Sequence, residues 1–320
     1  MSKPDLLMTV PMIPHATKQI EALFNVHKLW EAADKDALLS KVGQQIKAVA
    51  NHSKVDAAMM AKMPNLKIVA GFGVGYDNVD AKYASQHGII VTNTPNVLNE
   101  EVADTALGLL LMTVRELPQA ERWLRAGHWT AKGDYPLTAT TLRDRTVGIV
   151  GLGRIGQAIA QRVAAFGVPV VYHSRRPVAG VSYKHYPDLL GMAREADTLI
   201  VITPGGAATA NLINAEVLKA LGPRGVLINM ARGSVVDEPA LIKALQDRTI
   251  QAAGLDVYAR EPSVPQELLA LPNVVALPHV ASASVHTRNA MGQLVVDNLK
   301  AFLADQPPLT PVPETPFKGW

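Results

Sequence analysis

Residues 147–156 read Val-Gly-Ile-Val-Gly-Leu-Gly-Arg-Ile-Gly, and this stretch decides the fold. A short apolar strand pattern runs directly into G-x-G-x-x-G, and a helical pattern follows over residues 154–166. In such a turn the glycines permit a tight bend, a close approach of the backbone to a pyrophosphate, and close packing of helix on strand. The N–H groups that open the helix then face the anion. The stretch therefore predicts a dinucleotide site, with contacts from Gly151, Gly153, Arg154, Ile155 and Gly156.

The end of the following strand pattern indicates which dinucleotide is bound. An enzyme that uses NAD usually places Asp or Glu there, to bind the ribose 2′-hydroxyl. This chain instead has Ser174, followed by Arg175 and Arg176, and its next carboxylate is Asp188. A carboxylate would repel a 2′-phosphate, whereas guanidinium groups bind one through charge-assisted hydrogen bonds. We therefore predict NADPH or NADP+ as the cofactor, with NADH less favoured; the alternative is that the two arginines only form a solvated loop.

Short apolar runs alternate with helical patterns on both sides of the glycine turn. The spacers between the runs are long enough for crossover helices, so parallel sheets are predicted. The expected fold class is therefore α/β, with two Rossmann-like or flavodoxin-like domains. Strands are expected at residues 6–10, 46–50, 67–71 and 88–92 before the turn, and at 147–150, 168–173, 198–203, 225–229, 251–256 and 274–276 from the turn onward.

The glycine turn begins almost halfway along the chain, and an amphipathic helix pattern covers residues 284–303 near its end. If that helix packs back on the N-terminal region, the domain that contains the turn is an insertion. We then expect a discontinuous substrate-binding (catalytic) domain of residues 1–98 plus 286–320 and an NAD(P)-binding Rossmann domain of residues 99–285. A cleft between two domains is a preferred place for a ligand.

The composition narrows the range of functions. The 320 residues include 31 basic and 28 acidic side chains, and no basic run is longer than two, so nucleic acid is not an expected partner. The chain has no cysteine, which excludes disulfides, thiolate zinc sites and thiol chemistry and is consistent with a reducing cytosol. The N-terminus matches neither a signal peptide nor a spanning helix. We therefore expect a cytoplasmic protein with no membrane partner and no metal site.

Four further segments carry a family resemblance. They are Gly71-Phe-Gly-Val74-Gly75 with the residues to 80, Asn229-Met-Ala-Arg232-Gly with the residues to 241, Gly254-Leu-Asp256 through Glu261-Pro262, and Leu277-Pro-His279-Val-Ala-Ser282. Taken together and in this order, they resemble the D-isomer-specific 2-hydroxyacid dehydrogenase family over almost the whole chain. Within it, the chain is most similar to the glyoxylate/hydroxypyruvate reductases and their hydroxyphenylpyruvate-reductase relatives. The expected reaction is then the NADPH-dependent reduction of a small 2-keto acid, glyoxylate or hydroxypyruvate first and aromatic 2-keto acids next.

The resemblance places three catalytic residues, Arg232, Glu261 and His279, each just after a predicted strand of the cofactor domain. His279 would give the proton to the carbonyl oxygen, because an imidazole exchanges protons near neutral pH. Glu261 would orient the imidazole and favour its protonated form. Arg232 would bind the substrate carboxylate and polarise the ketone. Taken singly, each has a plain alternative: a structural histidine beside a proline, a loop carboxylate, or a surface arginine.

The same resemblance implies further contacts. Val74 and Gly75 would bind the substrate carboxylate through backbone N–H groups, although a tight strand-to-helix turn is the alternative. Asp256 would lie near the nicotinamide carboxamide, or else be a structural carboxylate. The other cofactor contacts implied are Thr105, Thr203, Pro204, Met230, Ala231 and Ser282.

A homodimer is the expected assembly, since the resemblance places the region around Trp129 at a subunit interface. A tryptophan packed within its own subunit is the alternative, and the apolar helix pattern over residues 100–116 fits either an interface or a buried position. Two other functions remain open from the sequence. One is an NAD-dependent relative such as phosphoglycerate dehydrogenase, and the other is a non-catalytic, dinucleotide-sensing corepressor of the same family. Formate dehydrogenase is less favoured, because that group pairs its histidine with Gln where this chain has Glu261.

Overall fold

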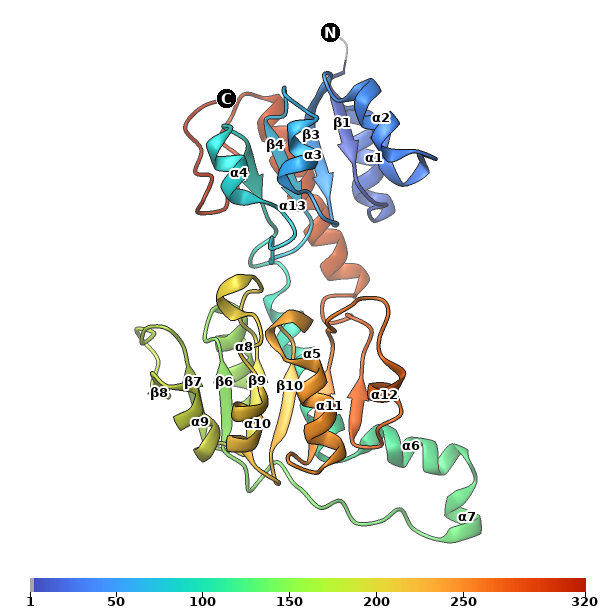
Figure 1. Cartoon of the computed structure of the whole chain (residues 1–320), viewed down its shortest axis with the longest axis vertical. Helices are drawn as coiled ribbons and strands as arrows, with labels where there is room; N and C mark the ends of the chain where they lie inside the picture. Colours follow the sequence, from blue (N-terminus) through green and yellow to red (C-terminus); the bar gives the residue numbers. More distant parts are fainter. Residues whose placement is uncertain (1–2) are drawn as a thin grey trace. The chain divides into compact units, whose positions relative to one another are not determined.

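A computed structural model describes residues 3–320 and separates them into two compact units (Figure 1). Unit 1 consists of two segments, the residues up to Leu98 and Ser284–Trp320. Unit 2 is the segment between them, Asn99–Ala283. The chain thus returns to unit 1 two residues before the expected boundary at residue 286. In the described part of the chain, no helix has both the length and the apolar character needed to cross a membrane.

Unit 1 is built on a five-stranded sheet in which all strand pairs are parallel, in the order β2-β1-β3-β4-β5. This is the flavodoxin-like order. Its strands are β1 (Asp5–Met8), β2 (Asn25–Lys28), β3 (Ile46–Asn51), β4 (Ile68–Gly71) and β5 (Ile90–Thr92). Its helices are α1 (Pro14–Leu23), the 3₁₀ turn η1 (Leu29–Glu31), α2 (Lys35–Val42), α3 (Ala57–Ala61), α4 (Ala81–Gln86) and α13 (Val285–Leu303).

Unit 2 contains a seven-stranded parallel sheet in the order β12-β11-β10-β9-β6-β7-β8. The order reverses between β6 and β9, which is the switch point where doubly wound folds bind ligands. The strands are β6 (Val147–Val150), β7 (Val170–His173), β8 (Lys184–Tyr186), β9 (Thr198–Val201), β10 (Val226–Asn229), β11 (Ala252–Leu255) and β12 (Val274–Ala276). The helices are α5 (Asn99–Val114), α6 (Leu117–Arg125), α7 (His128–Lys132), α8 (Arg154–Ala164), α9 (Leu189–Glu195), α10 (Ala215–Leu221), α11 (Glu238–Gln246) and α12 (Gln266–Leu269), with 3₁₀ turns η2 (Ala207–Thr209) and η3 (Gly233–Val235).

The central strands form where the sequence is continuously apolar. β6, β9 and β10 are buried along their whole length. Helices α5 and α8 pack together on one side of the sheet, and α9, α10 and α11 pack along the other (Figure 1). Strands covered on both faces have no polar face, which explains why they read as unbroken apolar runs.

Two strands, β2 and β8, were not expected from the sequence. They have the polar sequences Asn-Val-His-Lys and Lys-His-Tyr and lie at sheet edges, where each pairs with a single neighbour. An edge strand needs little apolar surface, so it lacks the pattern that identifies a central one. The expected counts of four and six strands are therefore corrected to five and seven.

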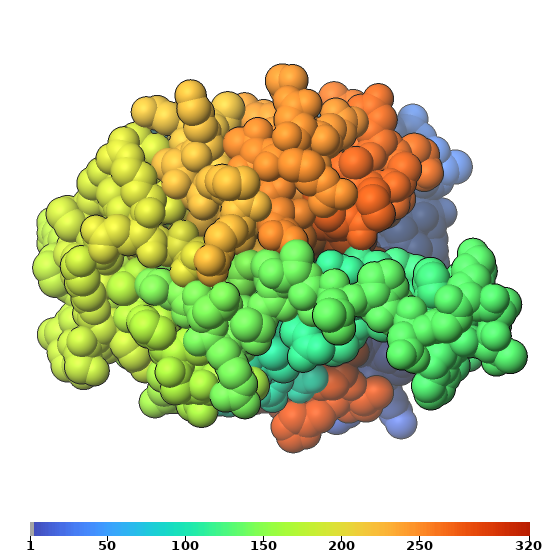
Figure 2. All heavy atoms as spheres, turned by 90° about the horizontal axis from the view of Figure 1, so that it is seen from below, coloured from blue at the N-terminus to red at the C-terminus, as the bar shows by residue number. Residues whose placement is uncertain are grey.

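Helices α6 and α7 form an arm that protrudes from the rest of unit 2, and no residue of either helix is buried (Figures 1 and 2). The Trp129 residue is 60% exposed, although its indole N–H donates to Asp134 Oδ1 over 3.0 Å. The alternative of a tryptophan packed within its own subunit is therefore wrong. Helix α5, by contrast, packs within unit 2 against β10, β11 and β12.

Candidate functional site

The glycine turn between β6 and α8 has a separate structural reason for each glycine. Gly151 has φ +101°, in the region that favours glycine. A Cβ on Gly156 would collide with the Gly151 carbonyl, whereas a Cβ on Gly153 would meet nothing within 4 Å. Helix α8 begins at Arg154, and no side chain caps its N-terminus. The turn therefore presents backbone N–H groups to open space, as a pyrophosphate site requires.

Thr203 supplies an independent test of whether a dinucleotide fits here. It follows β9, and a Cβ on Gly151 would lie 3.0 Å from Thr203 Cγ2. Its hydroxyl is buried and has no hydrogen-bond partner among the described residues. A buried hydroxyl without a partner is costly unless a ligand completes it. The unpaired Thr203 hydroxyl and the empty space beside Gly153 are both consistent with a dinucleotide bound at the switch point of the sheet.

Ser174, Arg175 and Arg176 line a hollow of about 660 Å³ directly after β7. The Ser174 hydroxyl donates to the Arg176 carbonyl over 2.6 Å, and His185 Nε2 lies 2.9 Å from the Ser174 carbonyl, so the turn is held from inside. Both arginines are exposed, and over residues 3–320 neither guanidinium pairs with a carboxylate. Two guanidinium groups are thus available to an anion.

Glu261 and His279 are predicted to be the reactive pair, and their side chains meet in the structure. Glu261 Oε2 lies 2.7 Å from His279 Nδ1, and Glu261 Oε1 accepts the Tyr258 N–H over 3.0 Å. Burial by itself would raise the pKa of the Glu261 carboxyl. The hydrogen bonds from His279 and Tyr258, with the charges of His279 and Arg232, outweigh burial and hold that pKa below its usual value. The pair is therefore a carboxylate beside an imidazole, and the side chain of His279 is 44% exposed.

Asp256, directly after β11, holds the backbone of His279 and of the two residues that follow it. Its carbonyl accepts the His279 N–H over 2.9 Å, and its carboxylate accepts the N–H groups of Val280 and Ala281 over 2.7 and 3.0 Å. The residue is 1% exposed, and burial raises the pKa of its carboxyl in spite of those two bonds. The carboxylate thus has a structural role, and its contact with a nicotinamide carboxamide stays a prediction.

Arg232 lies between β10 and η3. Its Nη1 donates to the Ala231 carbonyl over 2.8 Å, and Asn229 Nδ2 donates to the Arg232 carbonyl over 3.1 Å. The charge of Arg232 contributes to the low pKa of Glu261, and Gly233, the next residue, lies against the backbone of Tyr258 and Ala259. Unit 2 therefore brings Arg232, Glu261 and His279 into one cluster at the carboxyl ends of β10, β11 and β12.

The other predicted cofactor residues also lie in unit 2. The Thr105 hydroxyl, on α5, donates to the Ala281 carbonyl over 3.2 Å, which ties α5 to the segment after His279. The Pro204 carbonyl accepts the Thr209 hydroxyl over 2.7 Å. Met230 and Ala231 are buried, and Ser282 is half-buried. Their contacts with a cofactor stay predictions.

The glycine loop of unit 1 follows β4. Gly73 has φ +150°, its N–H donates to the Thr94 hydroxyl over 3.0 Å, and Asn93 Nδ2 donates to the Val74 carbonyl over 2.9 Å. Within residues 3–320, the N–H groups of Val74 and Gly75 have no acceptor. The loop is therefore a rigid turn that leaves two adjacent donors unused.

Two residues near the cluster were not singled out from the sequence. Glu238 Oε2 accepts the Ala259 N–H over 3.0 Å, and a Cβ on Gly233 would collide with the Tyr258 carbonyl. The sequence around Glu238 reads as the start of a helix, which it also is. Nothing in it indicates a contact 21 residues further along the chain.

Comparison with known proteins places this geometry in a family. A family model, "D-isomer specific 2-hydroxyacid dehydrogenase, NAD binding domain", matches residues 107–281. The chain belongs to the D-isomer-specific 2-hydroxyacid dehydrogenase family. This confirms the resemblance drawn from the glycine turn and the segments around Arg232, Glu261 and His279.

Individual members of the family match over nearly full length. The chain is 44% identical to the glyoxylate/hydroxypyruvate reductase A HPR2 of Arabidopsis thaliana, over 96% of this chain and 98% of that one. It is 42% identical to the hydroxyphenylpyruvate reductase of Plectranthus scutellarioides, with the same coverage. The crystal structure of an NADPH-dependent glyoxylate/hydroxypyruvate reductase from Sinorhizobium meliloti, in complex with NADP and malonate, matches with a TM-score of 0.95 and 54% identity, over 99% of this chain and 98% of that one. The two-unit α/β architecture is thus that of a known member.

Proposed function

We propose that the chain is an NADPH-dependent reductase of small 2-keto acids, which converts glyoxylate to glycolate and hydroxypyruvate to D-glycerate. One observation carries this proposal. The Glu261–His279 pair, 2.7 Å apart, lies in the same unit as the glycine turn and as the two unpaired guanidinium groups after β7, where the ribose of a bound dinucleotide is expected. The family membership and the names of the relatives support the same reaction.

The cluster can carry out the protonation half of the reaction. NADPH, when bound, supplies a hydride to the keto carbon. The two electrons of the carbonyl π bond then move to oxygen, and His279 Nε2 gives its proton to that oxygen and becomes neutral. Glu261, hydrogen-bonded to Nδ1, orients the ring and stabilises its protonated form beforehand. Arg232 stabilises the negative charge that develops on the oxygen.

The substrate carboxylate is assigned to the glycine loop as part of the same proposal. Val74 and Gly75 offer two adjacent N–H groups without an acceptor, which is the arrangement that binds a carboxylate through its two oxygens. Two hydrogen bonds, from the Gly73 N–H to Thr94 and from Asn93 to the Val74 carbonyl, hold this pair of donors in place. The loop would then anchor the acid end of the substrate.

The direct test is turnover with both cofactors. We expect the protein to reduce glyoxylate and hydroxypyruvate with NADPH, and kcat/KM to be higher with NADPH than with NADH. The reason is that Arg175 and Arg176 would each form charge-assisted hydrogen bonds to the 2′-phosphate. The measurement is the loss of reduced-nicotinamide absorbance over a panel of 2-keto acids, and absence of turnover on all of them would contradict the proposal.

A double variant isolates the arginines in that test. Arg175→Ala/Arg176→Ala should lower kcat/KM for NADPH by about 10–100-fold, from roughly 1.5–3 kcal/mol lost with the charged contacts, and should leave the value for NADH unchanged. Arg194→Ala is the matched control, because Arg194 is an exposed residue of α9 and its guanidinium lies outside the hollow. If NADH served the unmodified protein better than NADPH, the assignment of the 2′-phosphate would be wrong.

A homodimer is also part of the proposal, with the arm of α6 and α7 as its contact. The arm exposes Leu117, Leu124 and Trp129, of which Trp129 is 60% exposed. Apolar side chains on a protruding element favour a partner surface. We expect light scattering after size exclusion to give twice the chain mass of 34.3 kDa, and Trp129→Ala to shift the mass toward the monomer. A monomer for the unmodified protein would exclude this assembly.

The cellular location is the remaining part of the proposal. We place the enzyme in the cytoplasm, because a chain without cysteine is consistent with a reducing compartment.

A further inference from the structure

The segment from Asp256 to Glu261, which connects β11 to the reactive pair, is held by two carboxylates. The Tyr258 N–H donates to Glu261, and the next N–H, that of Ala259, donates to Glu238 Oε2 over 3.0 Å. Successive backbone donors thus bind acceptors from two different parts of unit 2. One acceptor belongs to the reactive pair, and the other lies on the first turn of α11.

The Arg232 loop contacts the same segment from a second side. Gly233 lies so close to Tyr258 and Ala259 that any Cβ there would collide with their backbone atoms. Gly233 follows Arg232 directly, so the loop that bears the guanidinium and the loop that bears Glu261 touch through their main chains. The hydrogen bond from the Ala259 N–H to Glu238 is formed at this contact between the two loops.

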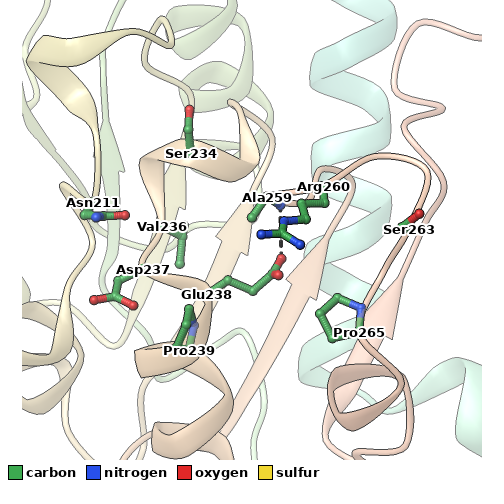
Figure 3. Close-up of a pocket in the computed structure, with 10 residues that line it drawn as sticks. All are labelled: Asn211, Ser234, Val236, Asp237, Glu238, Pro239, Ala259, Arg260, Ser263 and Pro265. Atoms are coloured by element: carbon green, nitrogen blue, oxygen red, sulfur yellow. Dashed lines mark hydrogen bonds between the residues drawn. The ribbon is translucent and has the colours of Figure 1, made fainter.

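Glu238 is not needed as the helix cap, which leaves its carboxylate available for this bond. Asp237 is the N-cap of α11 and accepts the Ala240 N–H over 3.1 Å. Figure 3 shows the Glu238 side chain turned away from its own helix, with a dashed line to Ala259, at the edge of a hollow of about 460 Å³. Among the described residues, the Ala259 N–H has no acceptor other than Glu238. Without Glu238 this N–H would face only water.

We propose that Glu238 is a positioning residue: its bond to the Ala259 N–H fixes the Tyr258–Glu261 turn so that Glu261 reaches His279 with Arg232 alongside. The inference rests on the proposed function, because it assigns Glu238 an effect on hydride transfer. Glu238 touches neither member of the reactive pair. Its removal would shift the turn that carries Glu261, and a shift of about 1 Å at a reactive centre can cost up to about 100-fold in rate.

Three substitutions separate the bond from the charge. Glu238→Gln keeps an oxygen acceptor at the same reach and removes the charge. Glu238→Asp keeps the charge and is one methylene too short to reach Ala259. Glu238→Ala removes both. Glu216→Ala is the matched control, since Glu216 is also a first-turn carboxylate, on α10, and over the described residues its side chain makes no hydrogen bond to another element.

The expected result is that Glu238→Asp and Glu238→Ala lower kcat about tenfold or more, with the KM for NADPH and for the keto acid within twofold of the unmodified protein. Glu238→Gln and Glu216→Ala should keep the original kcat. Hydrogen exchange of the peptide that contains Ala259 should be faster in Glu238→Asp and unchanged in Glu238→Gln. This exchange measurement needs no turnover.

Two outcomes would overturn the inference. In the first, Glu238→Asp keeps full kcat. In the second, Glu238→Gln loses as much kcat as Glu238→Asp, which would mean that the charge of Glu238 matters and its bond to Ala259 does not. Neither outcome affects the proposed function. An unmodified protein that reduces no 2-keto acid would instead overturn the proposed function itself.

Discussion

Replacement of His279 by asparagine is expected to lower kcat for keto-acid reduction by about 10²–10⁴-fold, the usual contribution of a positioned proton donor. The reason is that His279, held by Glu261 over 2.7 Å, is the proton donor in the proposed reaction. Asparagine cannot give up a proton at neutral pH. The affinity for NADPH should stay within twofold, because the glycine turn and the two arginines belong to other loops of unit 2.

Asparagine is the better first choice because of the backbone at this position. His279 has φ +52°, in the left-handed region, which asparagine tolerates and alanine resists. His279→Asn therefore removes the proton donor without added backbone strain, and His279→Ala serves as the second variant. Kinetics should be compared with NADPH titrations followed by fluorescence. Turnover within threefold of the original rate in both variants would remove His279 from the proton step.

The pKa of Glu261 gives a second measurement of the effect of replacing His279. Burial raises the pKa of its carboxyl, and His279 is the largest of the causes that lower it. In His279→Ala the pKa of Glu261 should therefore rise, which a carboxyl-carbon NMR titration would follow. The contribution of Glu261 to the free energy of unfolding changes with its pKa. A carboxyl whose pKa is lower in the folded state stabilises the fold above its usual pKa and loses that effect as the pH falls. His279→Ala should reduce this contribution.

The sequence predicted the central strands well because burial on both faces removes ambiguity. β6 (Val147–Val150) was expected at the observed residues and β10 (Val226–Asn229) within one residue of them, and α5, α8 and α13 were expected within a few residues of their ends. The polar edge strands β2 and β8 were missed for the opposite reason. Their pairing depends on a neighbour in the sheet, and the local sequence does not encode that neighbour.

In the candidate site, too, local features could be predicted from the sequence and long-range contacts could not. The glycine turn could be predicted from spacing alone, because each glycine answers a local need for a bend or a close approach. Arg232, Glu261 and His279 needed the family resemblance, since single residues after three different strands show no pattern by themselves. The contacts that hold them, from Asp256 and Glu238, could not be predicted at all. Each joins residues more than twenty positions apart, and only the packed sheet brings them together.

Replacement of Arg145 by methionine is expected to destabilise unit 2 by about 3–5 kcal/mol, because it removes a buried guanidinium and leaves the Arg224 carbonyl without a donor. Arg145 precedes β6 and is 1% exposed. Its Nη1 donates to the Asp197 carbonyl over 2.6 Å, at the start of β9, and its Nη2 to the Arg224 carbonyl over 3.0 Å, just before β10. One guanidinium thus joins the amino ends of three neighbouring strands. Burial lowers its pKa, as expected for a cation held mainly by neutral carbonyls.

Arg224→Met is the matched control for this prediction. The Arg224 side chain is 63% exposed and pairs with Asp144 over 3.3 Å, and exposed pairs of this kind contribute about 0–1 kcal/mol. Hydrogen exchange of the β6, β9 and β10 peptides should be used beside denaturant unfolding, since a chain of two units need not unfold in one step. These peptides should lose protection in Arg145→Met and keep it in Arg224→Met. Equal stability of the two variants would mean that the buried guanidinium does not hold the strand ends together, and that solvent reaches those carbonyls once Arg145 is gone.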